Sequence, residues 1–385
     1  MALYFMERYD YIFAGAGCAA FSLVFHLKRS SLNKKRVLLI DPLIDQVPDK
    51  TWCYWAKEPL SIHPKHAIHS WNSLHLNFAG KKTTKHLGDL RYFHINSKDF
   101  YQSIFEDFKK SENIVFKKAL VKTIQEDSKG VKVITSNGEN YQADFAFDSR
   151  FDPSQFIDQS HLKQVFSGWR IETTKPIFDK DSFTLMETRE NSNSHFDFFY
   201  ILPFSKTSAL VEFTAYSKDR IDQSTLEKEL RSYLSKQLNT EDYKTSFREI
   251  GMIPMTTYKQ KRKFSQKIIP IGTAAGWTKA STGYTFQRIQ ENVKTIISNL
   301  EKSIPVQKGI QRKLRFEFYD NILLNIASKW PESLPDVFET LFRRNSTEKV
   351  LRFLSEETSV FEELKLLGRL DYSIFIKSLL SYEKN

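Results

Sequence analysis

The sequence predicts a mixed α/β protein that contains a Rossmann-like, dinucleotide-binding domain. Three observations lead to this class: an apolar strand at residues 9–14, the G-x-G-x-x-A loop that follows it, and an acid at the end of the next strand. Strand, loop, helix and strand in this order form the βαβ unit that holds the pyrophosphate of a dinucleotide. Small residues also suit an ordinary strand-to-helix turn, so the loop by itself leaves a plain structural role open.

Small residues at three positions of the loop have separate tasks. Gly15 allows the tight turn, Gly17 lets the backbone approach the phosphates, and Ala20 lets the following helix pack closely. The helix that begins here directs free amide groups and the positive end of its dipole at the same point. We therefore expect the pyrophosphate to lie against this loop.

Asp41 closes the second strand, which spans residues 36–41. An acid at this position is placed to bind the hydroxyls of a ribose. An acid in place of an arginine favours an unphosphorylated ribose, and therefore FAD or NAD over NADP.

The elements after residue 41 follow from apolar periodicity. We expect strands at 73–78, 114–116, 119–126, 130–135 and 143–148, and a helix at 97–110. From about 160 to 260 the pattern predicts an antiparallel sheet with strands at 165–172, 183–187, 195–202 and 209–216, and a helix at 224–237. A buried strand at 268–272 should return to the first sheet, and a helix at 287–300 follows it.

The last 80 or so residues are of a different kind, because apolar residues recur there at helical spacing. The helices are expected at 316–326, 334–342, 349–354 and 361–370, with basic residues on their polar sides. Two interpretations stay open: a cap packed on the sheets, or a basic amphipathic surface that rests on lipid and admits an apolar substrate. The expected domains are residues 1–61, 92–157 and 262–300 for nucleotide binding, 62–91 and 158–261 for the substrate sheet, and 301–385 for the cap.

Composition limits the partners. The chain has 385 residues and a net charge of +11, which suits an anionic membrane surface or nucleic acid. The basic residues are spread along the whole chain without a nucleic-acid motif, so we expect no nucleic acid.

Cys18 and Cys53 form no C-x-x-C pair, and no cysteine or acid cluster completes a site around His63, His66 and His69. We therefore expect neither a disulfide scaffold nor a metal, and a reducing cytoplasm.

Two further features concern membranes and pockets. We expect no signal peptide, because Asp10 interrupts the first apolar run, and no apolar run reaches about 18 residues, so any membrane contact should be peripheral. Aromatic residues make up 14% of the chain. This content fits ordinary core packing, and it equally fits a long apolar pocket that holds a carbocation against ring faces.

A set of segments along nearly the whole chain carries a family resemblance, namely residues 49–55, 91–92, 148–150, 164–169, 185–187, 199–204, 210–214, 251–255, 272–276, 281–284, 342–345 and 352–354. Together they resemble the corresponding segments of the bacterial lycopene β-cyclases, within the flavoprotein monooxygenase-like superfamily. The resemblance implies an FAD-binding domain of the glutathione-reductase and aromatic-hydroxylase type, an antiparallel β-sheet substrate domain and a C-terminal helical cap. It implies FAD contacts at Gly15, Gly17, Ala20, Asp41, Gly272, Thr273, Ala274, Ala275, Gly276 and Gly283.

Two departures from these patterns bear on function. Gly272, Thr273 and Ala274 replace the G-D-A of the wider superfamily, which argues against the phosphate binding of ordinary hydroxylases and agrees with the cyclases. Met186 and Glu187 stand where the cyclases usually carry Met-Asp, so Glu187 is left out of the expected catalytic set.

The activity that the resemblance implies is an isomerisation by an intramolecular lyase. A proton adds to the terminal double bond of lycopene, an internal double bond closes the ring, and loss of a ring proton gives a β-ionone ring, first in γ-carotene and then in β-carotene. FAD acts in its reduced form, with NADH or NADPH as a reductant that is not consumed stoichiometrically. Related acyclic carotenoids are further candidate substrates, and the enzyme is expected at the cytoplasmic face of the membrane.

Glu212 is the expected acid, or the carboxylate that stabilises the cation, because it lies in an otherwise apolar strand where burial raises the pKa of a carboxyl. A solvent-facing glutamate on an edge strand is the plain alternative. Trp52, Trp55 and Tyr284 are the candidate ring faces of the substrate pocket, with core packing as their alternative role.

Two other functions stay open for the chain as a whole. One is an FAD-dependent monooxygenase or reductase acting on another isoprenoid, and the other is a flavin-binding protein with a lipid-carrier or assembly role. The residues leave β, ε and γ ring products open, as well as the number of rings and the oligomeric state.

Overall fold

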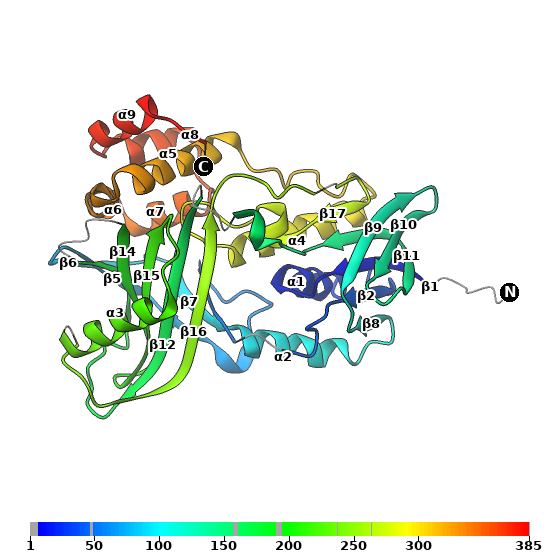
Figure 1. The fold of residues 1–385 in the computed structure, drawn as a ribbon, viewed down its shortest axis with the longest axis horizontal. Coiled ribbons are helices and arrows are strands. Elements are labelled where there is room, and N and C mark those ends of the chain that lie inside the picture. The colour runs from blue at the N-terminus through cyan, green and yellow to red at the C-terminus, as the bar shows by residue number, and fades with distance from the viewer. Residues whose placement is uncertain are drawn as a thin grey trace.

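The computed structural model describes residues 7–46, 49–156, 161–189, 195–236, 238–262 and 264–384, and within these ranges the strands form two large sheets and one small sheet. Figure 1 shows the two large sheets at opposite ends of the molecule, with the cap helices over one end of the second sheet. The space between the two sheets holds the site described below.

The first sheet has the strand order β8-β2-β1-β11-β10-β9, with β17 paired to β11. Its strands are β1 (Glu7–Ala14), β2 (Val37–Ile40), β8 (Ile114–Lys117), β9 (Val121–Asp127), β10 (Gly130–Thr135), β11 (Asn140–Asp148) and β17 (Ile268–Pro270). β1 runs parallel to β2 and β11, and the helix α1 (Cys18–Leu27) follows β1, which confirms the predicted βαβ start. The return of the late strand is also confirmed, since β17 pairs in parallel with β11.

Two other helices pack on this sheet or beside it, α2 (Ser97–Phe108) and α4 (Phe286–Glu301). The predicted strand 268–272 was too long, because β17 ends at Pro270 and Gly272 begins a 3-10 turn (Gly272–Ala275) with a φ of +65°. A strand cannot continue through a residue with this backbone conformation.

The second sheet has the strand order β16-β12-β15-β14-β13-β5-β6. Its strands are β5 (Ser73–Phe78), β6 (Lys81–His86), β12 (Leu162–Thr173), β13 (Ser182–Thr188), β14 (Phe196–Pro203), β15 (Ser208–Ser217) and β16 (Tyr243–Met255). The strands predicted between residues 160 and 260 pair antiparallel, as expected, and β5, from an earlier part of the chain, joins β13 in parallel and makes the sheet mixed. β16 was not predicted, since its residues alternate between exposed and half-buried and lack a strong apolar run.

Each face of the second sheet has its own cover. The helix α3 (Gln223–Lys236) packs with Val211 and Phe213 on one face, whereas Leu210 and Tyr216 face the cap. The last residue of the helix predicted at 224–237, Gln237, lies outside the described residues. Because side chains alternate along a strand, the even-numbered residues of β15 face the interior of the molecule.

A small sheet of β3 (Thr51–Ala56), β7 (Arg91–Asn96) and β4 (His69–Trp71) lies between the two cores. Trp52 and Tyr54 on one face of β3 join the core of the first sheet, whereas Cys53 and Trp55 join the core of the second sheet and the cap. Residues 51–55, which belong to the first stretch of the family resemblance, therefore lie in a strand with a different core on each side.

The cap consists of α5 (Leu314–Lys329), α6 (Leu334–Arg344), α7 (Thr347–Leu354), α8 (Val360–Leu367) and α9 (Tyr372–Leu380). The helix predicted at 361–370 ends at Leu367, and α9 was not predicted. The Asp371 side chain caps α9 by accepting from the Ser373 N–H, which starts a new helix at this point. Across the ranges that the structure covers, no helix is both long enough and apolar enough to cross a bilayer.

Candidate active site

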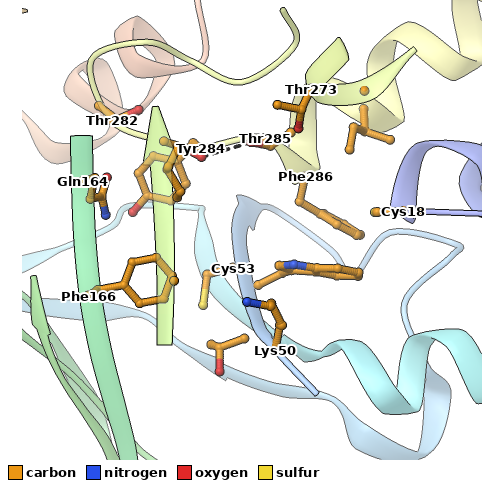
Figure 2. A pocket seen from close by; sticks show the side chains of 18 of the residues that line it. Cys18, Lys50, Cys53, Gln164, Phe166, Thr273, Thr282, Tyr284, Thr285 and Phe286 are labelled. Carbon is orange, nitrogen blue, oxygen red and sulfur yellow. Dashed lines mark hydrogen bonds between the residues drawn. The ribbon is translucent and has the colours of Figure 1, made fainter. Parts of the chain in front are cut away.

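One cavity of about 960 Å³ runs between the two large sheets, from the glycine loop to the cap. Figure 2 shows Phe166 of β12 on one side of this pocket, Cys18 of α1 on the other side, and Cys53 between them. Most of the predicted site residues line it, namely Gly15, Gly17, Asp41, Trp52, Trp55, Glu212, Gly272, Thr273, Gly283 and Tyr284. Ala20, Ala274, Ala275 and Gly276 do not line it and lie behind this surface or beside it.

The glycine loop leaves room for a ligand at its turn. Gly15 has a φ of +94°, and a Cβ at this residue would lie 2.4 Å from the Ser149 hydroxyl oxygen. Gly17 has no neighbouring atom within 4 Å of the position that its Cβ would take. Because Gly17 is also the N-cap of α1, open space and unpaired amide groups coincide there, which fits the pyrophosphate of a dinucleotide.

Asp41 ties the loop to the end of β2. Its two carboxylate oxygens accept the backbone N–H groups of Ala16 at 2.8 Å and Leu43 at 2.7 Å. Each oxygen keeps a second lone pair, so the carboxylate can still accept a ribose hydroxyl.

A second glycine-containing segment, residues 272–283, forms another wall of the cavity and closes it. A Cβ at Gly272 would lie 3.1 Å from the Ala19 Cβ of α1, and a Cβ at Gly283 would lie 2.9 Å from Oε1 of Gln164 on β12. These two glycines therefore let the segment touch both halves of the molecule. Gly276 ends the intervening 3-10 turn with a φ of +70°.

Three tyrosines form a hydrogen-bonded row in the middle of the cavity. The Tyr92 hydroxyl lies 2.9 Å from both the Tyr200 and the Tyr284 hydroxyl oxygens, and Tyr200 donates to Sγ of Cys53 at 3.3 Å. Burial raises the pKa of all three tyrosines, so they are neutral at physiological pH. The row offers electron-rich rings and neutral hydroxyls to a substrate.

The predicted ring faces divide into two places. The Trp55 ring lies 4.9 Å from the Tyr284 ring at 73°, and its indole N–H donates to the Ser355 hydroxyl at 2.7 Å. Trp52 lies on the opposite face of β3 and stacks on Phe286 at 5.7 Å. Trp55 and Tyr284 thus form one aromatic wall, and Trp52 belongs to the end of the cavity nearer the glycine loop.

Glu212 projects from β15 into the cavity. Its Oε1 accepts the Thr214 hydroxyl at 2.7 Å. Burial, and then the nearby charge of Glu249, raises the pKa of Glu212 to about 8. A carboxyl with this pKa carries its proton at neutral pH and can act as an acid.

Glu249 of β16 lines the same cavity and was not singled out in the sequence. One feature of the sequence could have pointed to Glu249. It stands two residues before Gly251, so both residues lie on the same face of a strand. Glu187, by contrast, pairs with Phe199 on the α3 face of the sheet and does not line the cavity.

The far end of the cavity is apolar and belongs to the cap. It is lined by Phe338, Leu341, Phe342, Leu351 and Leu354 of α6 and α7. The cavity therefore changes from a polar, amide-lined end at the glycine loop to an apolar end below the cap.

The family comparison covers almost the whole chain. The model of the family described as "Lycopene cyclase protein" matches residues 10–380. The comparison with curated protein sequences finds no match.

Several solved structures share the fold. A geranylgeranyl bacteriochlorophyll reductase-like protein from Thermoplasma acidophilum has a TM-score of 0.68 at 12% identity, over 97% of this chain and 99% of that chain. A flavoprotein/dehydrogenase from Cytophaga hutchinsonii has a TM-score of 0.62 at 11% identity, over 97% and 98% of the two chains. The halogenase PltM in complex with phloroglucinol and FAD has a TM-score of 0.57 at 14% identity, over 96% and 86%.

These likenesses concern the fold, and they confirm the predicted fold class of a Rossmann-like domain joined to a sheet domain. The family match adds what the fold leaves open. Because it spans residues 10–380, from the glycine loop through both sheets to the end of the cap, this chain belongs to the lycopene cyclase family.

Proposed function

We propose that this protein is a lycopene β-cyclase that closes the acyclic ends of lycopene to β-ionone rings, giving γ-carotene and then β-carotene. The observation that carries the proposal is Glu212, a carboxyl with a raised pKa that faces an aromatic cavity continuous with a dinucleotide loop. Such an acid can protonate an isolated double bond, because the apolar cavity excludes the water that would otherwise take up the proton.

FAD is the proposed cofactor, held by Gly15, Gly17, Asp41 and the segment Gly272–Gly276. The open space at Gly17 supports this assignment, as does the cofactor bound to PltM, which shares the fold. Bound in its reduced form, after reduction by NADH or NADPH, FAD would supply negative charge that stabilises the cation.

The chain's own residues perform the remaining tasks. Glu212 gives its proton to the terminal double bond, and the Thr214 hydroxyl holds the carboxyl in place. The rings of Trp55 and Tyr284 face the positive charge that follows. The apolar lining from the cap excludes water, which would otherwise quench the cation.

We also propose that the cap rests on the membrane that contains the substrate, as a peripheral contact at the cytoplasmic face. Large apolar side chains are exposed on α8 and α9, and Phe361 is 65% and Leu380 84% exposed. Figure 1 shows α8 and α9 at the outer end of the cap. The exposed Lys365 and Lys377 on the same helices match an anionic lipid surface.

The test is to incubate the purified protein anaerobically with lycopene in liposomes, FAD and NADPH, and to separate the pigments by chromatography. We expect γ-carotene and then β-carotene, without stoichiometric loss of NADPH. Glu212→Gln should keep its flavin and form no rings. Glu172→Gln, an exposed glutamate on β12, is the matched control and should behave as the wild type.

Other outcomes would replace the proposal. Unchanged lycopene with flavin bound and reduced would favour a monooxygenase or reductase of another isoprenoid, which oxygen uptake coupled to NADPH oxidation would identify. Pigment that binds without conversion would favour the lipid-carrier role.

A further inference from the structure

Glu212 and Glu249 stand on either side of one glycine. In the register of the second sheet, Gly168 of β12 lies opposite Glu212 of β15 on one side and opposite Glu249 of β16 on the other. Residues that oppose each other in neighbouring strands point to the same face of the sheet. Both carboxyls therefore face the same cavity, with two strand spacings, or about 10 Å, between their Cα atoms.

The missing side chain at Gly168 makes room for Glu249. A Cβ at Gly168 would lie 3.2 Å from Cγ and 3.4 Å from Oε1 of Glu249. The Glu249 carboxyl thus lies over Gly168, on the side of its own strand that faces Glu212. Any larger residue at position 168 would occupy the space between the two carboxyls.

The two carboxyls have different partners. Oε2 of Glu249 accepts the Thr51 backbone N–H at 3.1 Å, and a backbone N–H can only donate, which favours an ionised carboxylate there. The partner of Glu212 is the Thr214 hydroxyl, which can donate or accept and therefore also suits a protonated carboxyl. This asymmetry places the proton on Glu212 and the charge on Glu249.

One oxygen of Glu249 is left for a ligand. Glu249 is 7% exposed, and its Oε1 has no hydrogen-bond partner among the residues that the structure describes. Buried acceptors without a partner are costly, so they mark places where a donor or a positive charge arrives.

Electrostatics support the same division. Burial raises the pKa of both glutamates, and the charge of Glu249 raises the pKa of Glu212 further, so ionisation of both carboxyls together is disfavoured. Lys50 and Asp49, next to Thr51, and the neutral Cys53 and Tyr284 are the other titratable groups that act on the pair. The pair therefore carries one proton and one negative charge near neutral pH.

We propose that Glu249 is a second catalytic carboxylate, the base that removes the ring proton after Glu212 has protonated the substrate. This inference rests on the proposed cyclase function. The proton of Glu212 forms a C–H bond at the terminal double bond, and the electron pair of the internal double bond forms the ring C–C bond. The ring C–H bond then breaks, its proton passes to Oε1 of Glu249, and its electron pair becomes the ring double bond.

The step is balanced, since one proton enters and one leaves and no electrons are gained or lost. Return of the proton from Glu249 to Glu212 restores the starting state. The division of labour follows the usual rule that two titratable groups with different surroundings take the roles of acid and base.

The experiment separates protonation from deprotonation by running the reaction in D2O and analysing lycopene and products by mass spectrometry. The wild type should form rings that each carry one deuterium. Glu212→Gln should form no rings and leave lycopene unlabelled. Glu249→Gln should still label lycopene through reversible protonation, but form rings about 100-fold more slowly or worse.

Glu249→Asp keeps the carboxylate one methylene farther away and should form rings at a rate between those of the wild type and Glu249→Gln. Thermal unfolding and flavin content are measured for each variant, with Glu172→Gln as the control. Ring formation by Glu249→Gln at the wild-type rate would overturn the base role, and so would the absence of deuterium from the lycopene incubated with Glu249→Gln. A wild type that forms no rings at all would instead overturn the cyclase function on which the inference rests.

Discussion

The Lys279 ammonium lies 2.9 Å from Oδ1 of Asp320, and both side chains are almost fully buried. Lys279 belongs to the segment that closes the cavity, and Asp320 belongs to α5 of the cap. Arg312 and Glu356 complete a buried cluster of alternating charge. The cap is therefore attached to the closing segment by a charge network, beside its apolar contacts.

Asp320→Ala should lower the free energy of unfolding by about 3–5 kcal/mol, because the carboxylate of Glu356 is then left to compensate the buried charges of both Lys279 and Arg312. Urea unfolding followed by circular dichroism measures this change. Asp89→Ala breaks the exposed pair with Lys57 and should leave the midpoint unchanged. Equal midpoints for the Asp320 variant and the wild type would show that the cluster adds no net stability.

Gly17→Val should abolish flavin binding while the flavin-free protein keeps its stability. The valine side chain meets no atom of the protein but fills the open space at the loop, and Gly17 has no positive φ that a side chain would strain. Flavin absorbance per protein and thermal unfolding without flavin give the two readouts. Gly17→Ala is the graded comparison, with an intermediate loss expected. Full flavin content in the valine variant would contradict the placement of the pyrophosphate.

Because the pKa of Glu212 is raised in the folded protein, the protein should become less stable as the pH rises. The pKa is about 8 in the folded protein and about 4.3 in an unfolded chain, so between these values the folded state holds a proton that the unfolded state has lost. The free energy of unfolding then falls from about pH 4.3 to about pH 8 and levels off above it. Urea unfolding of the wild type and Glu212→Gln at pH 5, 7 and 9 should show the variant gaining relative stability at each step. A constant difference would mean that Glu212 is ionised throughout.

Gly168→Ala should slow ring formation while leaving the fold and flavin content intact. The new Cβ would force Cγ of Glu249 away by a few tenths of an ångström, because 3.2 Å is closer than carbon atoms normally approach. A misplacement of about 1 Å can reduce turnover by about 100-fold, so this smaller shift should reduce turnover by less than that. Ring formation in liposomes measures the effect, and an unchanged rate would argue against a role for the Glu249 position.

Phe361→Ser combined with Leu364→Ser should weaken binding to anionic vesicles without changing thermal stability, since both side chains are 65% exposed. Ile68→Ser, at an exposed apolar residue just before β4 and outside the cap helices, is the matched control. Sedimentation with phosphatidylglycerol vesicles measures binding. Equal binding of the double variant and the wild type would exclude this face of α8 as the membrane contact.

Much of the architecture is encoded locally. The strand at 9–14, the glycine loop and the helix after it were predicted because a βαβ start depends on residues within about 30 positions of one another. The cap helices were predicted for the same reason, apart from α9, where Gly368 and the Asp371 cap divide one apolar stretch into two helices. The domain boundaries and the roles of the predicted site residues stay predictions.

The sequence by itself determined the types of most elements, the turn chemistry of its glycines and the presence of an acid in an apolar strand. It could not determine which strands pair, because hydrogen bonds between strands join residues that are far apart in the chain. The sequence of one strand contains little that identifies its partner. Only the tertiary structure paired β5 with β13 in parallel and placed Gly168 between Glu212 and Glu249. The proximity of two carboxyls 37 positions apart therefore depends on the register of three strands, and the pKa of each depends on the apolar surroundings that packing creates around them.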